Sequence, residues 1–172
     1  MTIAVMSDVH DNIWNLEQAL RRMRDYDPET LLFLGDFCAP FSLAQIAEGF
    51  SGPVHAVFGN NDGDPFLLSR IASGYPHVSL HGQMADLELN GVRIALNHYP
   101  EIARPIALSG QYRAVFSGHD HRRYTEQLGE TLWANPGEVM GRFGEPSFGI
   151  YDSEQGTFQH VDIALTGAVG GP

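Results

Sequence analysis

The chain has 172 residues, a length that suits one domain with a sizeable core and is short for two. Apolar residues make up 43% of it and charged residues 18%, the balance of a soluble globular protein. Ten Lys and Arg stand against 21 Asp and Glu, and the resulting net charge of −11 argues against binding of duplex nucleic acid.

Three apolar runs in the first half predict strands, at Ile3–Met6, Leu31–Leu34 and Val54–Phe58. Two helical patterns separate these runs, one ahead of Arg24 and one over Leu43–Phe50. An order of strand, helix, strand, helix, strand predicts parallel pairing with right-handed crossovers.

The first of these helices has the clearest periodicity. Apolar residues spaced by three or four positions define one face, namely Leu16, Ala19, Leu20 and Met23. Asp11 or Asn12 can cap the N-terminus, and Arg21 and Arg22 follow late, an order that suits the helix dipole.

The second half changes to hairpin patterns. Alternating apolar residues flank Asn90-Gly91, the strongest short-range signal for a hairpin. Two further hairpins are predicted around Gly129-Glu130 and Gly156, and their strands are Tyr124–Leu128 with Thr131–Ala134, and Phe148–Tyr151 with Phe158–Ile163. A helix over Glu101–Ser109 and a strand over Ala114–Phe116 complete this half.

Five apolar runs lead to a side chain that can bind a metal ion, and these side chains are Asp8, Asp36, Asn60, His98 and His119. His10 and His121 each lie two residues beyond one of them. In open α/β sheets, sites form just outside the carboxyl ends of strands, so these groups can converge on one point. Carboxylates, imidazoles and amide oxygens suit first-row divalent metals, and one carboxylate can bridge two ions.

Each motif alone carries little weight, because Asp-x-His arises by chance and Gly-Asp is common in turns. The ordered set is more specific. It consists of Asp8-x-His10, Gly35-Asp36, Gly59-Asn60-Asn61-Asp62, His98 and Gly118-His119-x-His121.

From about Met1 to Tyr151 this pattern resembles the calcineurin-like metallophosphoesterases, especially the small single-domain phosphodiesterases. Asn135-Pro136-Gly137 resembles a late turn of that family. The resemblance implies an α/β fold in which two mixed β-sheets pack face to face with helices outside, and a dinuclear metal site at one edge.

The resemblance also implies the ligands of two divalent ions. Asp8, His10 and His121 would bind the first ion, Asn60, His98 and His119 the second, and Asp36 would bridge both. Manganese is the metal we expect, with iron, zinc or nickel as alternatives. A hydroxide bridging the ions would attack the phosphorus in line with the leaving group.

Catalytic roles are predicted for Asp36, Asn61 and Asn12. Asn61 stands where many family members carry a catalytic His, and Asn12 could either bind substrate oxygens or cap the first helix. Tyr99 and Glu138 stand where Gly and Ser are frequent. These departures bear on substrate choice and leaving-group catalysis, while the metal ligands are complete.

Other polar residues receive structural interpretations. We expect His55, His77, His81 and His160 to be surface or packed residues, and Cys38 to be packed. Arg122 and Arg123 could meet a phosphate, but a solvated pair is the favoured interpretation.

The predicted function is hydrolysis of a phosphodiester, with a small phosphate ester as the binding partner. A phosphomonoesterase, a nucleotide pyrophosphatase and a non-catalytic scaffold of the same fold are the alternatives, and a homo-oligomer remains open.

The predicted domain covers residues 1–165, and a glycine-rich tail over 166–172 is expected to be disordered. With one cysteine, no signal-peptide pattern and no long apolar run, the expected location is the cytoplasm, without a membrane partner.

Overall fold

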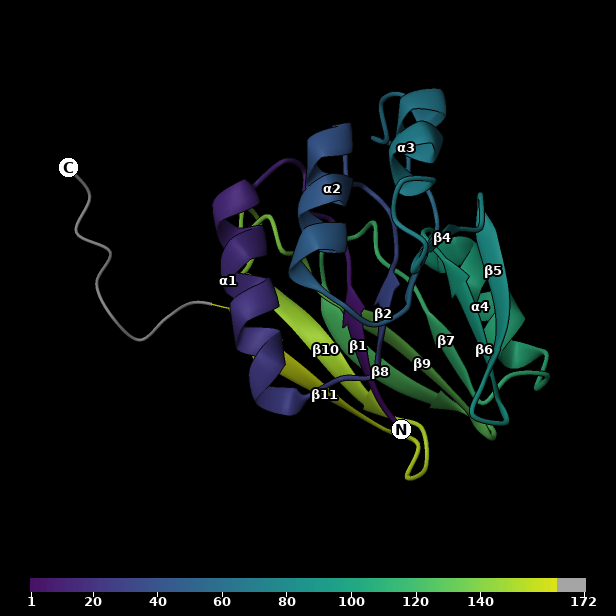
Figure 1. Ribbon diagram of the computed structural model, residues 1–172. Coiled ribbons are helices and arrows are strands. Elements are labelled where there is room, and N and C mark those ends of the chain that lie inside the picture. Colours follow the sequence, from purple (N-terminus) through teal and green to yellow (C-terminus); the bar gives the residue numbers. More distant parts are fainter. Residues whose placement is uncertain (164–172) are drawn as a thin grey trace.

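The computed structural model describes residues 1–163 (Figure 1). Our predictions of a domain end at residue 165 and of a disordered tail over 166–172 lie outside these residues. Among the described residues, no helix combines the length and apolarity that crossing a membrane requires.

The first of two sheets has six strands in the order β11-β10-β1-β2-β3-β4. Four neighbouring strands run parallel, namely β1 (Thr2–Met6), β2 (Thr30–Phe33), β3 (Val54–Ala56) and β4 (Val78–Leu80). An antiparallel hairpin extends the sheet beyond β1 and consists of β10 (Ser147–Asp152) and β11 (Thr157–Asp162).

The second sheet has five strands in the order β5-β6-β7-β9-β8. The parallel centre is formed by β6 (Val92–Asn97), β7 (Ala114–Phe116) and β9 (Thr131–Pro136). Antiparallel partners lie at both edges, namely β5 (Met84–Leu89) and β8 (Arg123–Leu128).

Helices cover the outer face of each sheet. Side by side over the first sheet lie α1 (Ile13–Met23), α2 (Pro40–Gly49) and α3 (Pro65–Ala72), and a short 3₁₀ helix, η1 (Arg24–Tyr26), follows α1 (Figure 1). The second sheet is covered by α4 (Pro100–Leu108).

Alternating side chains along β1 show how this layering arises. Ile3 and Val5 pack between the two sheets, while Ala4 and Met6 pack under the helices. Because successive side chains of a strand point to opposite faces, a central strand that is apolar throughout must be covered on both sides. The predicted sandwich of two mixed sheets with helices outside is therefore confirmed.

The predicted strands and hairpins are present, and Asn12 is the residue that caps α1 by accepting a hydrogen bond from Asn15. Three elements were not predicted, namely η1, α3 and β4. The strand β4 has only three residues, and none of them is fully buried. No apolar run therefore marks this strand in the sequence. Asp64 caps α3 and Pro65 begins it, a start signal that was overlooked.

Candidate metal centre

All seven predicted ligands come together at one edge of the sandwich, just beyond the carboxyl ends of β1, β2, β3, β6 and β7. Backbone hydrogen bonds tie the loops that carry them. The amide of His10 donates to the carbonyl of Asp36 at 3.1 Å, and the amide of Gly118 donates to the carbonyl of His98 at 3.0 Å. The predicted convergence of strand ends is therefore present in the fold.

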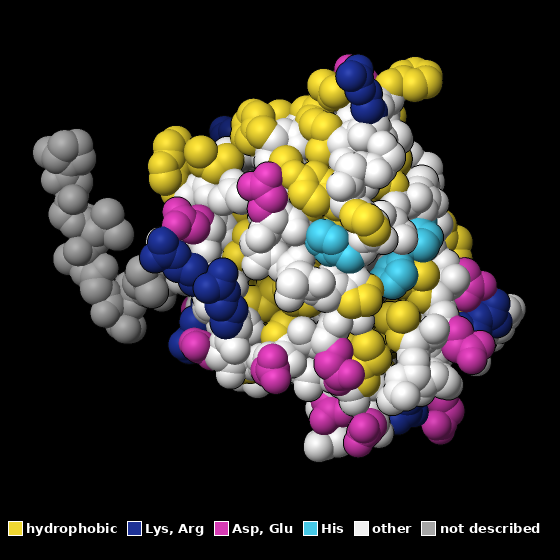
Figure 2. Space-filling model, in the orientation of Figure 1, with side chains coloured by type: hydrophobic (Ala, Val, Ile, Leu, Met, Phe, Trp, Pro, Cys, Tyr) yellow, Lys and Arg dark blue, Asp and Glu magenta, His cyan; other side chains and the backbone are white. Residues whose placement is uncertain are grey.

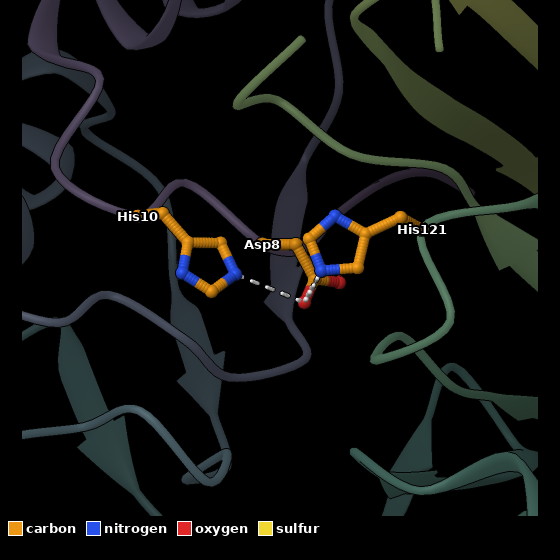
Figure 3. Close-up of side chains that lie close together, drawn as sticks. All are labelled: Asp8, His10 and His121. Atoms are coloured by element: carbon orange, nitrogen blue, oxygen red, sulfur yellow. Dashed lines mark ion pairs between the residues drawn. The ribbon is translucent and has the colours of Figure 1, made fainter. Parts of the chain in front are cut away.

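Asp8, His10 and His121 form one half of the cluster (Figure 3). The Asp8 carboxylate is fully buried, and its Oδ1 atom lies 3.7 Å from His10 Nε2 and 3.6 Å from His121 Nε2. Both imidazoles direct a nitrogen toward the same oxygen, and the two rings are stacked with a centroid distance of 5.1 Å (Figure 3).

Asp36 connects this half to the other. Its Oδ2 atom lies 3.3 Å from His10 Nε2 and 3.5 Å from His98 Nε2. Asn60 closes the second half, because its Oδ1 atom lies 3.1 Å from His98 Nε2 and 2.9 Å from His119 Nδ1. One carboxylate thus lies between two groups of nitrogen and oxygen donors.

Two buried polar atoms of the cluster, Asp8 Oδ1 and His10 Nε2, have no hydrogen-bond partner within residues 1–163. A buried polar atom without a partner is costly, and a cation bound between these two atoms would satisfy both. Two carboxylates, four imidazoles and one amide oxygen are also donors that a first-row divalent metal prefers. The residues present therefore fit a metal centre.

The charges of the cluster favour a cation as well. Burial opposes ionisation of Asp36, but hydrogen bonds from His98 and Asn61 outweigh it and hold the pKa of this carboxyl below its ordinary value. Burial also opposes protonation of His98 and His10, but the Asp8 and Asp36 carboxylates outweigh it and raise the pKa of both imidazoles. Positive charge is therefore stabilised between the carboxylates.

Neighbouring groups hold the imidazoles in position. His98 Nδ1 lies 2.7 Å from the carbonyl oxygen of Leu34, and this nitrogen must be the donor because a carbonyl can only accept. In the neutral ring, the form that can bind a metal ion, His98 Nε2 is then left with a lone pair facing Asp36. His121 Nδ1 is bound to the carboxylate of Glu138, and His10 Nδ1 lies 3.4 Å from Cys38 Sγ.

Strained backbone is concentrated in the loops of the cluster. Nine residues other than glycine have positive φ among the described residues, and only Asp27 and Asn90 lie away from these loops. The other seven are Asp8, His10, Asp11, Asp36, Cys38, His119 and His121. Such conformations are uncommon and cluster at functional sites, where the surrounding structure holds them in place.

Two glycines allow the loops to approach each other closely. A Cβ atom on Gly118 would lie 2.0 Å from Ser7 Oγ and 2.6 Å from Asp8 Oδ2. A Cβ atom on Gly59 would lie 2.2 Å from Asp36 Oδ1. Any larger residue at either position would displace a carboxylate of the cluster.

Two carboxylates that support the site were not predicted. Asp62 accepts hydrogen bonds from the amides of Asp36, Cys38 and Gly59, at 3.1, 3.1 and 2.7 Å, and so holds two site loops together. Glu138 was interpreted only as a departure from a frequent Ser, but it is buried and contacts His121 directly. A carboxylate inside the Gly59-Asn60-Asn61-Asp62 motif was the only signal for Asp62.

Three further residues were singled out in the sequence, Asn12 and Asn61 for catalytic roles and Tyr99 as a departure from the family pattern. The side chain of Asn12 caps α1 and donates to the carbonyl of Met140 at 2.9 Å, so its substrate role stays a prediction. Asn61 donates to Asp36 from its amide side chain and from its backbone, both at 2.8 Å. The ring of Tyr99 packs edge-on against the rings of His98 and His119.

The residues given structural interpretations lie outside the ligand cluster, with the exception of Cys38, which touches His10. His55 and His81 contact each other at 3.0 Å, while His77 and His160 bind backbone carbonyl groups. Burial, together with nearby carboxylates, raises the pKa of the Cys38 thiol to about 12, which agrees with a packed, neutral group.

Arg122 and Arg123 are both exposed, as expected for a solvated pair, but the guanidinium of Arg123 also contacts the protein. It binds Ser147, the carboxylate of Asp162 and the carbonyl of Glu145, because β8 lies beside the turn that leads into β10. Arg123 is therefore a structural residue.

Exposed apolar side chains surround this edge. The second residue of each of the first three helices is an exposed aromatic, Trp14 at 72%, Phe41 at 54% and Phe66 at 90%. Apolar side chains are visible over these helices, and histidine side chains gather in one part of the same face (Figure 2). Phe143 is 69% exposed and packs edge-on against His121. Phe143 therefore places an exposed aromatic ring at the rim of the cluster.

Residues 1–156 match the calcineurin-like phosphoesterase superfamily domain. A phosphodiesterase of Methanocaldococcus jannaschii is 29% identical over 164 residues, which cover 94% of this chain and 98% of that protein. A solved archaeal phosphodiesterase has a TM-score of 0.87 at 28% identity, with 94% of this chain and 99% of that one covered. Yfce, a phosphoesterase from E. coli, shares the fold with a TM-score of 0.69 at 21% identity, over 95% of this chain and 100% of its own.

The fold and the ligand cluster define an enzyme that hydrolyses phosphoric esters. The chain belongs to the calcineurin-like phosphoesterase superfamily.

Proposed function

We propose that this protein is a phosphodiesterase that binds two divalent metal ions, most favourably manganese, and hydrolyses a small phosphate ester in the cytoplasm. The observation that carries the proposal is Asp36, whose Oδ2 atom lies between His10 and His98 and so between the two donor groups. Similarity to an archaeal phosphodiesterase over 94% of the chain supports a diester as the substrate.

Two bound ions would lower the pKa of a water molecule for attack on the phosphorus and would neutralise the phosphoryl oxygens. The protein's own residues prepare this chemistry. Asp8, His10 and His121 would hold one ion, Asn60, His98 and His119 would hold the other, and Asp36 would bridge them. Because strand ends and buried partners fix these side chains, little reorganisation is needed on binding.

Formal charge favours a substrate of modest charge. Two divalent ions bring four positive charges, and Asp8 and Asp36 bring two negative charges, so the centre is cationic in a chain of net charge −11. A phosphodiester carries one negative charge and a monoester nearly two, and the acidic surface repels the monoester more strongly. The exposed Phe143 at the rim offers a surface on which the organic part of an ester can pack.

Hydrolysis of bis-p-nitrophenyl phosphate by metal-depleted protein tests the proposal. Manganese should restore turnover after exhaustive chelation, and p-nitrophenyl phosphate should react more slowly. Activity that survives chelation would overturn the mechanism, and preferred turnover of the monoester would favour a phosphomonoesterase. Nucleotide pyrophosphates in the same panel would reveal a pyrophosphatase.

Matched histidine variants locate the activity. His121→Ala removes an expected ligand, whereas His77→Ala removes a half-buried histidine that binds a backbone carbonyl outside the cluster. Activity should fall sharply only in His121→Ala. Two bound ions without any turnover would support the non-catalytic scaffold instead.

A further inference from the structure

Glu138 is a buried carboxylate at the end of the Asn135-Pro136-Gly137 turn, directly behind the ligand cluster. Its side chain is 1% exposed. One carboxylate oxygen, Oε2, binds the Nδ1 atom of His121. The other, Oε1, accepts the backbone amides of Phe143 and Gly144 at 2.5 and 2.9 Å.

A buried carboxylate is costly unless it is paired and hydrogen-bonded, and these three donors provide that pairing. Two of the donors are backbone amides of one loop, which a neutral acceptor could also satisfy. The third is an imidazole nitrogen of His121, the nitrogen on the far side of the ring from Asp8. The negative charge of Glu138 is therefore directed at His121.

We infer that Glu138 is a positioning residue that keeps the Nδ1 atom of His121 protonated and its Nε2 atom free to bind the first metal ion. The inference rests on the proposed function, because it requires His121 to be a ligand. A histidine that binds a metal commonly donates its other N–H to a carboxylate, which fixes the tautomer and strengthens the ligand.

Glu138 has a second effect through the same side chain. Its bonds to the amides of Phe143 and Gly144 hold the loop over Gly141–Glu145, and the ring of Phe143 packs edge-on against His121 with a centroid distance of 5.1 Å. One carboxylate thus fixes a metal ligand and the rim beside it. Among residues 1–163, no other histidine of the cluster forms an ion pair with a carboxylate outside it.

Glu138→Gln tests the inference because the amide keeps the shape of the side chain and loses the second acceptor. If the oxygen faces the loop, the amide group donates to His121 Nδ1 and favours the tautomer that cannot bind metal. If the oxygen faces His121, the NH₂ group faces two backbone N–H donors and cannot accept a hydrogen bond from either. Neither orientation satisfies all three partners.

Manganese binding to metal-depleted full-length protein is the readout, measured by calorimetry and by equilibrium dialysis. Affinity for the first ion should fall about 10–100-fold in Glu138→Gln, while affinity for the second ion stays unchanged. Glu145→Gln is the matched control, because it removes an exposed carboxylate from the same loop and should bind both ions normally.

Nitrogen NMR of His121 in metal-depleted wild-type protein, in mildly alkaline buffer, tests the same point without a substitution. The neutral imidazole should carry its proton on Nδ1, and a proton on Nε2 would overturn the inference, even if Glu138→Gln does not fold. Unchanged affinity of Glu138→Gln for both ions would also overturn it and would leave the proposed function intact. Failure of the wild-type protein to bind manganese would overturn the proposed function itself.

Discussion

The two halves of the ligand cluster are held in place by different means. In the half proposed to hold the first ion, Asp8 is fully buried, and His121 is fixed by the buried carboxylate of Glu138. In the half proposed to hold the second ion, His98 is fixed by a backbone carbonyl, while Asn60 is exposed and contacts His98 and His119 directly. The first half is thus fixed by a buried carboxylate, whereas the second half includes one exposed ligand, Asn60.

This difference predicts unequal affinities for the two ions. Groups that are already oriented lose less conformational freedom on binding, so the first ion should bind more tightly than the second. Asp36 belongs to both halves. Substitutions in only one half should therefore show how much each half contributes to metal binding.

The largest effect on activity is expected for Asp36→Asn, because this change should weaken metal binding in both halves. Loss of a bridging ligand should lower the rate on bis-p-nitrophenyl phosphate by more than about 100-fold, the upper range for residues that only support a ligand. Circular dichroism should show a retained fold, because Asp36 follows a strand end and lies outside the apolar core.

Asn12→Ala is the comparison for Asp36→Asn. It removes the helix cap, which costs about 1 kcal/mol of folding free energy, and leaves the ligands in place. Equal rates for the two variants would remove Asp36 from the bridging role.

Smaller effects are expected from two glycine substitutions, one of which should act on the first half alone and the other on both halves. In Gly118→Ala the new Cβ atom would press on Ser7 and Asp8, so the tighter binding step should weaken. In Gly59→Ala it would press on Asp36, so both steps should weaken. Each change should also lower the free energy of unfolding by about 1–3 kcal/mol through overpacking.

Manganese titration of both glycine variants distinguishes these patterns. Gly144→Ala serves as the control, since no atom lies within 4 Å of the new Cβ atom. The hydrogen bond from the backbone amide of residue 144 to Glu138 is kept. Identical loss of both steps in the two variants would mean that the halves are not independent.

A modest effect is expected for Asp62→Asn. Asp62 uses both carboxylate oxygens to accept three backbone amides, and an asparagine has only one acceptor oxygen. The free energy of unfolding in urea should fall by about 1–2 kcal/mol, and the second ion should bind more weakly.

Asp64→Asn is the matched control for Asp62→Asn, because asparagine replaces aspartate well as the cap of α3. Equal stability of the two variants would show that the bonds made by Asp62 contribute little.

The convergence of the seven predicted ligands could be predicted because five of them follow an apolar run that becomes a strand, and strand ends meet at one edge of a sheet. The layers were predictable for a related reason, since β1 is apolar and buried at every position after Thr2 and must be covered on both faces. In each case a local sequence pattern identifies the strands, and the geometry of β-sheets determines where their ends and faces lie.

The supporting residues were not predictable in the same way. Glu138 and Asp62 act by accepting hydrogen bonds from residues that only the fold brings near, and no local pattern reports such contacts. Positive φ at His10 or His121 is likewise imposed by the packing of loops, since histidine has no strong preference for it. The bonds of Arg123 depend on β10, which is distant in the sequence.

The smallest effect is expected at Asn61, which lies beside the second half. Its side chain donates to Asp36, and two roles follow from that position. Asn61 could stabilise the leaving oxygen of the substrate, as the histidine of relatives is thought to do, or it could only hold Asp36. Asparagine can donate a hydrogen bond but cannot deliver a proton near neutral pH, so esters with poor leaving groups should react slowly.

Asn61→His should therefore raise the rate on alkyl esters more than on nitrophenyl esters. A gain of about tenfold is expected, below the roughly 100–10,000-fold of full general acid catalysis, because the imidazole must also replace the bond to Asp36. The measurement is the dependence of rate on leaving-group pKa for both proteins, each loaded with manganese. Asn61→Ala is the control and should lower all rates by a similar factor. If the slopes of the wild-type protein and Asn61→His are the same while both bind two ions, Asn61 only holds Asp36 in place.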